Sequence, residues 1–178
     1  MLRLALSAAV LTVLTAPAFA LELTSPDVSD GQLFPQKFVC AAQGGENVSP
    51  AYAWSGVPAE ARSLAITIHD PDAPREGGFW HWLLVDIPPT ATGIAQGAAA
   101  AGKVPVAGAV PLPNGAGHAN YDGPCPPAGK PHHYVTTLYA LPMARADVNA
   151  STPPGGVGDW LAKHAIAKAV MTPVFAKK

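Results

Sequence analysis

The sequence has few charged residues and no excess of either sign. Asp, Glu, Lys and Arg make up 13% of its 178 residues, and the formal net charge is −1 at pH 7. The chain therefore has no basic stripe of the kind that attracts a nucleic-acid backbone, and we expect no nucleic-acid partner. Its 49% hydrophobic content argues against a disordered chain and fits a compact globular protein.

Several motifs are missing as well. After the first 20 residues no apolar run is long enough to cross a bilayer, and no internal repeat or heptad pattern is visible. The sequence has no HExxH or comparable metal-ligand spacing and no Ser/His/Asp arrangement, so we expect no cofactor and no metal. By contrast, 20 prolines and 17 glycines predict many turns and few long helices.

Residues 1–20 are typical of a secretory signal peptide. Arg3 precedes an apolar core over residues 4–14, and residues 18–20 (Ala-Phe-Ala) form a small-x-small cleavage site. A retained membrane anchor is the alternative, but the run is short and a proline interrupts it. We expect cleavage to leave residues 21–178 as a single domain, periplasmic or secreted, without a transmembrane anchor.

The chain has only two cysteines, Cys40 and Cys125. In an oxidising compartment two cysteines most simply form a disulfide, which would tether the segment around Cys125 to the N-terminal part of the fold. Two buried free thiols are the alternative.

Hydrophobic alternation predicts strands over residues 52–54, 63–69, 81–87, 134–141 and 174–175. In the third of these, regular alternation places His81 on the same face as Leu83, Val85 and Ile87. Residues 91–118 are poor in aromatics and rich in Gly, Ala and Pro, which predicts a long connection.

One appreciable helix is expected near the C-terminus. Asp159 is a plausible N-cap, residues 160–171 are rich in alanine, and Pro173 would end the helix. The predicted fold is therefore mainly β, a sandwich with long crossovers and a C-terminal helix.

The first of two distant segments that carry polar chemistry is the loop Asp70-Pro71-Asp72-Ala73-Pro74. Its prolines restrict the backbone, so the two carboxylates can be aimed. His81 follows at the start of a strand, between two tryptophans. Taken alone, each has a plain structural explanation, because such Asp side chains often cap local N–H groups and such a histidine is often a core residue.

The second segment begins with the rigid run Gly123-Pro124-Cys125-Pro126-Pro127, whose backbone N–H groups can approach an anion closely. His132 and Tyr134 lie two apart on the following strand and so share a face, whereas His133 points to the other face.

Together, Asp70, His81, His132 and Tyr134 would suit a phosphate or a similar oxyanion, because imidazolium and phenol groups donate hydrogen bonds. The carboxylate fits such a site if it shares a proton with the phosphate, whose second pKa is about 6. We therefore predict that binding strengthens as the pH falls toward about 6.

These segments resemble the signature blocks of the phosphatidylethanolamine-binding protein family, also called Raf kinase inhibitor-like proteins, in its bacterial branch. The resemblance covers nearly all of the mature chain and rests on residues 47–50, 54–58, 70–87 and 123–141. It implies a large central β-sheet packed on a smaller one, a C-terminal helix, and a pocket for phosphate-bearing ligands at one end. The family pocket falls on Asp70, Asp72, His81, Gly123, Pro127, His132 and Tyr134, with Trp80 as a wall residue.

The chain departs from the family pattern in several places, and the loop over residues 41–46 looks longer than usual. Residues 114–117 read Asn-Gly-Ala-Gly where bacterial relatives usually carry an N-D-F-G-like turn. The extra C-terminal helix of animal relatives is also absent, which implies a more open pocket.

Three functions compete. The leading prediction is non-enzymatic binding of a phosphorylated small molecule or lipid headgroup. The alternative is an exported inhibitor that contacts a protein target such as a protease or kinase, with residues 91–118 as the contact loop. A second alternative is a metal-dependent or acid–base phosphoester hydrolase, because two histidines and an aspartate imitate a facial metal triad. The plain structural reading is that these residues only buttress the end of a sheet.

Overall fold

The computed structural model describes residues 20–177, and the rest of the predicted signal peptide lies outside the described residues. The elements in this part of the chain are β1 (Glu22–Thr24), η1 (Gln36–Phe38), η2 (Ala41–Gln43), β2 (Tyr52–Ser55), β3 (Ser63–Asp70), β4 (Phe79–Ile87), β5 (Gly93–Ile94), β6 (Val110–Leu112), β7 (His132–His133), β8 (Val135–Leu141), α1 (Pro154–His164), β9 (Ala167–Met171) and β10 (Val174–Phe175). No helix among them has the length and hydrophobicity needed to cross a membrane.

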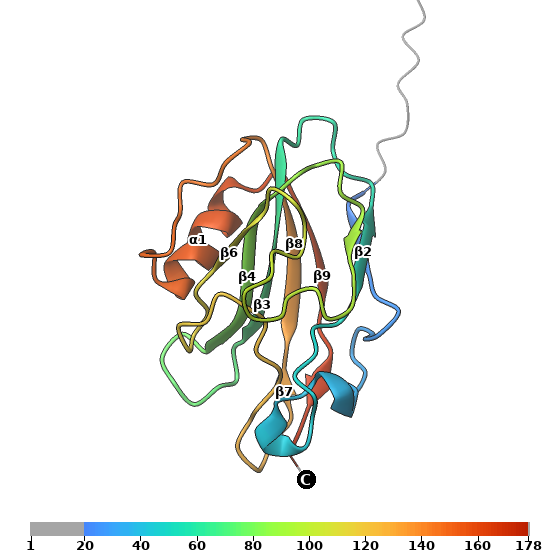
Figure 1. The fold of residues 1–178 in the computed structure, drawn as a ribbon, viewed down its shortest axis with the longest axis vertical. Coiled ribbons are helices and arrows are strands. Elements are labelled where there is room, and N and C mark those ends of the chain that lie inside the picture. Colours follow the sequence, from blue (N-terminus) through green and yellow to red (C-terminus); the bar gives the residue numbers. More distant parts are fainter. Residues whose placement is uncertain (1–19, 178) are drawn as a thin grey trace, which may run out of the picture.

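The strands form one large and one small antiparallel sheet and a short extra pair. The large sheet has the order β6-β4-β3-β8-β9, the small sheet the order β1-β2-β5, and β7 pairs with β10. Figure 1 shows α1 on one face of the large sheet and β2 of the small sheet on the other. The predicted fold class is confirmed: a mainly β sandwich with a helix near the C-terminus.

Two hydrophobic cores lie on the two faces of the large sheet. Leu64, Ile66 and Ile68 of β3 point into the core between the sheets, whereas Ala65 points into the core beneath α1. All four side chains are at most 1% exposed. Burying a large aliphatic side chain contributes about 1.5–3 kcal/mol, so this central strand fixes the sandwich.

β4 does not alternate as the sequence suggests, because it carries a β-bulge at His81. The register of β4 against β3 shifts between Ile68 and His69, and His81 has no partner in that pairing. The bulge leaves His81 against Tyr134, with ring centroids 5.2 Å apart, on the side of the core between the sheets. Such bulges bend a strand and re-aim a side chain.

A second irregularity lies at the far end of the same strand. Asp86 adopts a positive φ of 57°, and the register shifts again near Leu64. Ile87 therefore points into the core between the sheets, while Leu83 and Val85 pack beneath α1. The predicted common face of His81, Leu83, Val85 and Ile87 is wrong, because two bulges interrupt the alternation.

The C-terminal segment divides into a helix and a strand. α1 begins at Pro154, where a proline is well accommodated in the first turn, so Asp159 lies inside the helix and is not its N-cap. The predicted helix over residues 160–171 is wrong in its second half. There the burial alternates with a period of two, which fits the edge strand β9.

Gly158 of α1 allows a close approach between the helix and the large sheet. A Cβ atom at this position would lie 2.0 Å from Cη2 of Trp80. Trp80 therefore packs directly on the helix backbone, which requires a glycine at position 158.

Candidate functional site

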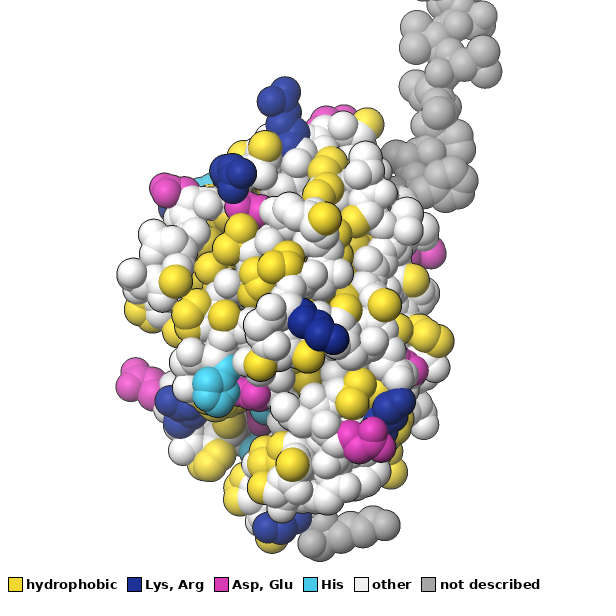
Figure 2. Space-filling view, in the orientation of Figure 1, with side chains coloured by type: hydrophobic (Ala, Val, Ile, Leu, Met, Phe, Trp, Pro, Cys, Tyr) yellow, Lys and Arg dark blue, Asp and Glu magenta, His cyan; other side chains and the backbone are white. Residues whose placement is uncertain are grey.

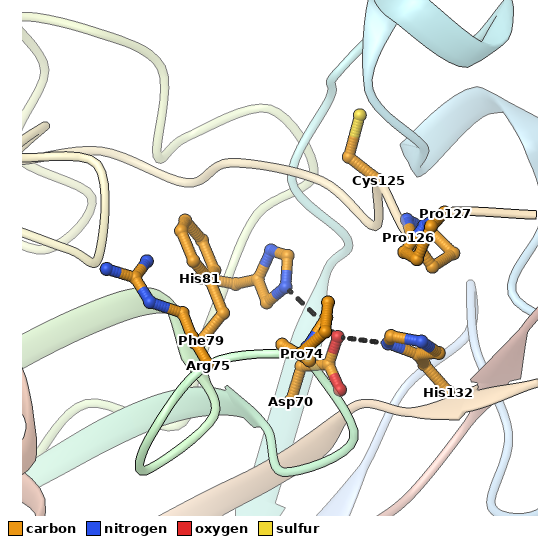
Figure 3. A pocket seen from close by; sticks show the side chains of 10 residues that line it. Asp70, Pro74, Arg75, Phe79, His81, Cys125, Pro126, Pro127 and His132 are labelled. Carbon is orange, nitrogen blue, oxygen red and sulfur yellow. Dashed lines mark hydrogen bonds and ion pairs between the residues drawn. The ribbon is translucent and has the colours of Figure 1, made fainter.

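A cavity of about 290 Å³ opens where β3 ends and β7 begins. We call it the Asp70 cavity; its lining residues are Asp70, Ala73, Pro74, Arg75, Phe79, His81, Cys125, Pro126, Pro127 and His132. Figure 3 shows Asp70 between the two imidazoles, with Pro126 and Pro127 on one side and Arg75 with Phe79 on the other. In Figure 2 histidine and acidic surfaces are visible in a hollow in the lower half of the molecule.

Asp70 is the central residue of the cavity and is only 3% exposed. Its Oδ2 accepts a hydrogen bond from Nδ1 of His132 at 2.7 Å, and its Oδ1 accepts one from the backbone N–H of Asp72 at 2.9 Å. Both oxygens are thus engaged, and β3 and β7 are joined through a buried carboxylate.

The loop that ends at Asp122, directly before Gly123, fixes the orientation of the His81 ring. Its Nδ1 lies 2.7 Å from the carbonyl oxygen of Asp122, which can only accept, so Nδ1 carries a proton. Its Nε2 lies 3.9 Å from Oδ2 of Asp70, beyond hydrogen-bond range, and has no partner although it is buried. A buried polar atom without a partner is unusual in proteins and marks a candidate ligand contact.

The two imidazoles keep Asp70 ionised. Burial alone would raise the pKa of this carboxyl, but the neighbouring imidazoles of His81 and His132 and the N–H of Asp72 outweigh burial, so the pKa lies below its ordinary value. The site therefore contains one negative charge, on Asp70, next to two imidazole rings that can be protonated.

Tyr134 lies next to the cavity without lining it. Its hydroxyl is buried and has no hydrogen-bond partner, and its ring contacts His81. Burial, reinforced by the charges of Asp70 and Asp72, raises the pKa of the phenol above its ordinary value, so Tyr134 is a neutral hydrogen-bond donor.

Four of the eight predicted site residues line the cavity: Asp70, His81, Pro127 and His132. Asp72 is on the exposed rim, where its Oδ2 accepts bonds from both the backbone N–H and Nδ1 of His133. These bonds lower the pKa of Asp72 below its ordinary value.

Gly123 and Trp80, two of the positions expected from the sequence, do not line the Asp70 cavity. The N–H of Gly123 donates to Oδ1 of Asn47 at 2.7 Å and so is not free for an anion. Trp80 stacks on His69, with ring centroids 4.2 Å apart, and faces α1, because the bulge at His81 separates it from the cavity side.

The sequence-based site omitted Arg75 and Phe79. Arg75 lies over the Phe79 ring, with its Cζ 5.3 Å from the ring centroid, and its Nη1 donates a long 3.4 Å bond to the carbonyl of Gly115. An arginine directly after the Asp70–Pro74 loop was the available signal, since it places a cation on the same turn as the two carboxylates.

Cys40 and Cys125 form a disulfide, which confirms the predicted pairing. Cys125 lines the cavity, and the N–H of Cys40 also donates to the carbonyl of Pro124 at 3.1 Å. The disulfide thus fixes the wall of the cavity that contains Pro126 and Pro127 to the segment before η2.

Asn114 organises the loop in which the chain departs from the family pattern. Its Nδ2 donates to Oδ2 of Asp122 at 2.8 Å, and its Oδ1 accepts from the N–H groups of Ala116 and His118. Since the Asp122 carbonyl accepts from His81, this loop sets the orientation of the imidazole. In residues 20–177 no group of three or more His, Cys, Asp or Glu side chains has the arrangement of a metal site.

Comparison with known proteins places this fold in a family. A sequence profile of the phosphatidylethanolamine-binding protein family matches residues 24–176. The chain belongs to this family. It is 39% identical over 169 residues to YbcL of Escherichia coli K12, covering 92% of each chain, and 35% identical over 165 residues to YbhB of the same organism, covering 88% of this chain and 100% of YbhB.

The crystal structure of E. coli YbcL, which is described as a member of the mammalian family, superposes with a TM-score of 0.84 at 37% identity, covering 90% of this chain and 100% of that one. The putative lipoprotein LppC of Mycobacterium tuberculosis is 42% identical over 160 residues, which is 87% of this chain and 71% of LppC. The range matched by the family profile includes both the Asp70–Ile87 and the Gly123–Leu141 segments.

Proposed function

We propose that the Asp70 cavity binds the phosphate group of a small molecule or lipid headgroup without chemical conversion. The observation that carries the proposal is the unpartnered Nε2 of His81, buried at the edge of a cavity of about 290 Å³. A phosphate oxygen at this position would accept the missing hydrogen bond. A bound phosphate ester would displace water from between the apolar proline walls, which would strengthen this bond.

Proton uptake would accompany binding. In the neutral rings Nδ1 carries the proton in both His81 and His132, because the partners are a carbonyl oxygen and an ionised carboxylate. Nε2 can donate to a phosphate only when the ring is an imidazolium. Binding therefore strengthens as the pH falls toward about 6, and a phosphomonoester, whose second pKa is about 6, can also share these protons, whereas a phosphodiester headgroup cannot.

This reasoning modifies the prediction made from the sequence. The pKa of Asp70 is lowered, so the shared proton belongs to the imidazole–phosphate contact and not to the carboxylate. The expected direction of the pH dependence is unchanged.

The test is a titration of the mature protein with inorganic phosphate and O-phosphoethanolamine at pH 6.0 and 7.5, followed by NMR. Three or four charge-assisted hydrogen bonds, less the cost of association, correspond to affinities as weak as about 1 mM, so the titration extends to about 50 mM. Saturable binding that is tighter at pH 6.0 and lost in His132→Ala supports the proposal. Equal affinity at both pH values, or no binding at all, contradicts it.

A hydrolase is distinguished in the same samples. Incubation with a chromogenic aryl phosphate, with and without added Zn²⁺ or Mn²⁺, is expected to release no phosphate. Turnover that is abolished by Asp70→Asn would replace the binding proposal with the hydrolase alternative.

We also infer that the mature protein is exported. The signal-like residues 1–20, the Cys40–Cys125 disulfide and the similarity to a putative lipoprotein support this proposal. Mass spectrometry of the protein purified from a periplasmic extract is expected to give an N-terminus at Leu21. Recovery of the chain with Met1 retained, in the cytoplasm and with free thiols, contradicts it.

A further inference from the structure

We infer that Arg75 selects ligands by the charge at the end remote from the phosphate, favouring a phosphate ester with a second anionic group over a zwitterionic headgroup. This inference rests on the proposed function, because it assumes that a phosphate occupies the imidazole end of the Asp70 cavity. It assigns Arg75 as a specificity-determining residue at the opposite end.

The side chains that line the cavity offer no free partner to an ammonium group. Asp70 is the only carboxylate among them, and both of its oxygens already accept hydrogen bonds, from His132 and from Asp72. The neighbouring carboxylate of Asp72 lies outside the lining, and its Oδ2 is engaged twice by His133. A desolvated ammonium would therefore lose its hydration and find only a carboxylate that already accepts hydrogen bonds from His132 and Asp72.

The same lining offers one cation to an anionic group. Arg75 forms no ion pair with any carboxylate in residues 20–177, and its long bond to Gly115 engages only one of five N–H donors. The ring of Phe79 positions the guanidinium from one side, which restricts its motion and leaves its edge donors available for a carboxylate or phosphate.

The distances suit a short ligand. The ring centroids of His81 and Phe79 are 4.7 Å apart, and Cζ of Arg75 lies 5.3 Å from the Phe79 centroid. The guanidinium is thus at most about 10 Å from the His81 ring centroid, with the apolar Phe79 ring between the two charged ends. A linker of two or three carbons between phosphate and carboxylate is long enough to bridge an interval of this size.

The experiment compares three compounds that differ only in the group at the tail. They are n-propyl phosphate, O-phosphoethanolamine and 3-phosphooxypropanoate, which end in a methyl, an ammonium and a carboxylate. Dissociation constants are measured at pH 6.0 for the wild type, Arg75→Gln, Arg75→Glu and the control Arg62→Gln, an exposed arginine outside the cavity lining. Inorganic phosphate, which has no tail, is titrated against each variant.

In the wild type we expect the carboxylate compound to bind about fivefold more tightly than the methyl compound and the ammonium compound about threefold less tightly, as partly exposed charge pairs allow. Arg75→Gln should compress the three values to within about twofold, and Arg75→Glu should reverse their order. Arg62→Gln should leave the order unchanged, and inorganic phosphate should change less than about twofold in Arg75→Gln.

The experiment distinguishes failure of the inference about Arg75 from failure of the proposed function. If inorganic phosphate binds through His132 but the order of the three compounds is absent or survives Arg75→Gln, the inference about Arg75 is wrong and the proposed function stands. If neither phosphate nor any ester binds, both are overturned.

Lipid vesicles distinguish a lipid headgroup from a free phosphate ester as the ligand. Phosphatidylserine differs from phosphatidylethanolamine by one carboxylate, so binding to vesicles that favours phosphatidylserine in the wild type and loses the preference in Arg75→Gln assigns a lipid headgroup. An Arg75-dependent order with the soluble compounds, without vesicle binding, assigns a free phosphate ester. Either result supports the charge selection by Arg75.

Discussion

Two aspartate–histidine pairs lie side by side at the end of this sandwich, and they differ only in their surroundings. Nδ1 of His132 is 2.7 Å from Oδ2 of Asp70, and Nδ1 of His133 is 2.7 Å from Oδ2 of Asp72. The side chains of the first pair are 8% and 4% exposed, whereas those of the second are 54% and 41% exposed. Equal bond lengths therefore do not imply equal roles.

The two pairs differ in how deeply they are buried. The Asp70–His132 pair lies against a second imidazole with an unpartnered Nε2, in a cavity with proline walls. The Asp72–His133 pair lies in water, where its attraction is screened and its role is to tie the loop after β3 to β7. The first pair is thus suited to binding a ligand, and the second to holding the rim.

The largest difference is expected on removing the carboxylates. Asp70→Ala should lower the free energy of unfolding by about 3 kcal/mol, at the low end for a broken buried pair because the cavity admits water. Asp72→Ala, with an exposed pair, should cost about 0–1 kcal/mol. Chemical denaturation with urea measures both, and equal losses would contradict the distinction between the pairs.

The next effect concerns the disulfide that fixes Pro126 and Pro127 in the wall of the cavity beside the Asp70–His132 pair. Replacing both cysteines by serine should lower the free energy of unfolding by about 2–4 kcal/mol, because the cross-link closes a long loop. It should also weaken phosphate binding and leave the Asp72–His133 pair unaffected. Urea denaturation and a phosphate titration of the Cys40→Ser, Cys125→Ser variant check this; unchanged binding would show that the wall is held without the disulfide.

A smaller effect separates the two histidines. His132→Gln should weaken phosphate binding by about tenfold, the value of one charge-assisted hydrogen bond. His133→Gln, the matched control one residue away, should change it less than about twofold. Isothermal titration calorimetry at pH 6.0 gives both constants, and comparable losses would place the ligand outside the Asp70 cavity.

The smallest expected effect concerns how steeply the stability of the fold falls at acid pH. Because the folded-state pKa of Asp70 is lowered, its carboxylate stabilises the fold fully above the unfolded value of about 3.9. That contribution is lost as the pH falls from there through the lower folded-state value. In Asp70→Asn the fall in stability between about pH 5 and 2 should be shallower than in the wild type, and in Asp72→Asn less changed. Thermal unfolding across this range measures the slopes, and identical slopes for wild type and Asp70→Asn would contradict the assignment.

The sequence predicts the regular parts of the fold better than the irregular ones. β3 alternates without interruption, so Leu64, Ile66 and Ile68 could be placed on one face from their spacing alone. In β4 the same reasoning failed, because nothing in the local spacing reveals the bulge at His81. The alanine content of residues 160–171 predicts a helix, but pairing with β8 overrides that propensity over residues 167–171.

The candidate site was predicted to a similar extent. Asp70, His81 and His132 could be named because they end or begin strands beside rigid turns. Trp80 does not line the cavity because of the bulge at His81, and the N–H of Gly123 is engaged by Asn47, which is distant in sequence; local spacing reveals neither feature. Arg75 was missed because its place over Phe79 depends on the path of the loop, which the sequence does not specify.

The central claim is that the two cavity histidines, and not their exposed neighbour, take up protons to bind phosphate. Ring ¹⁵N NMR of the six histidines at pH 7.5, before and after saturation with inorganic phosphate, tests it most directly. The account predicts imidazolium shifts for His81 and His132 on saturation, with His133 unchanged. Saturable phosphate binding that leaves the rings of His81 and His132 neutral would contradict it.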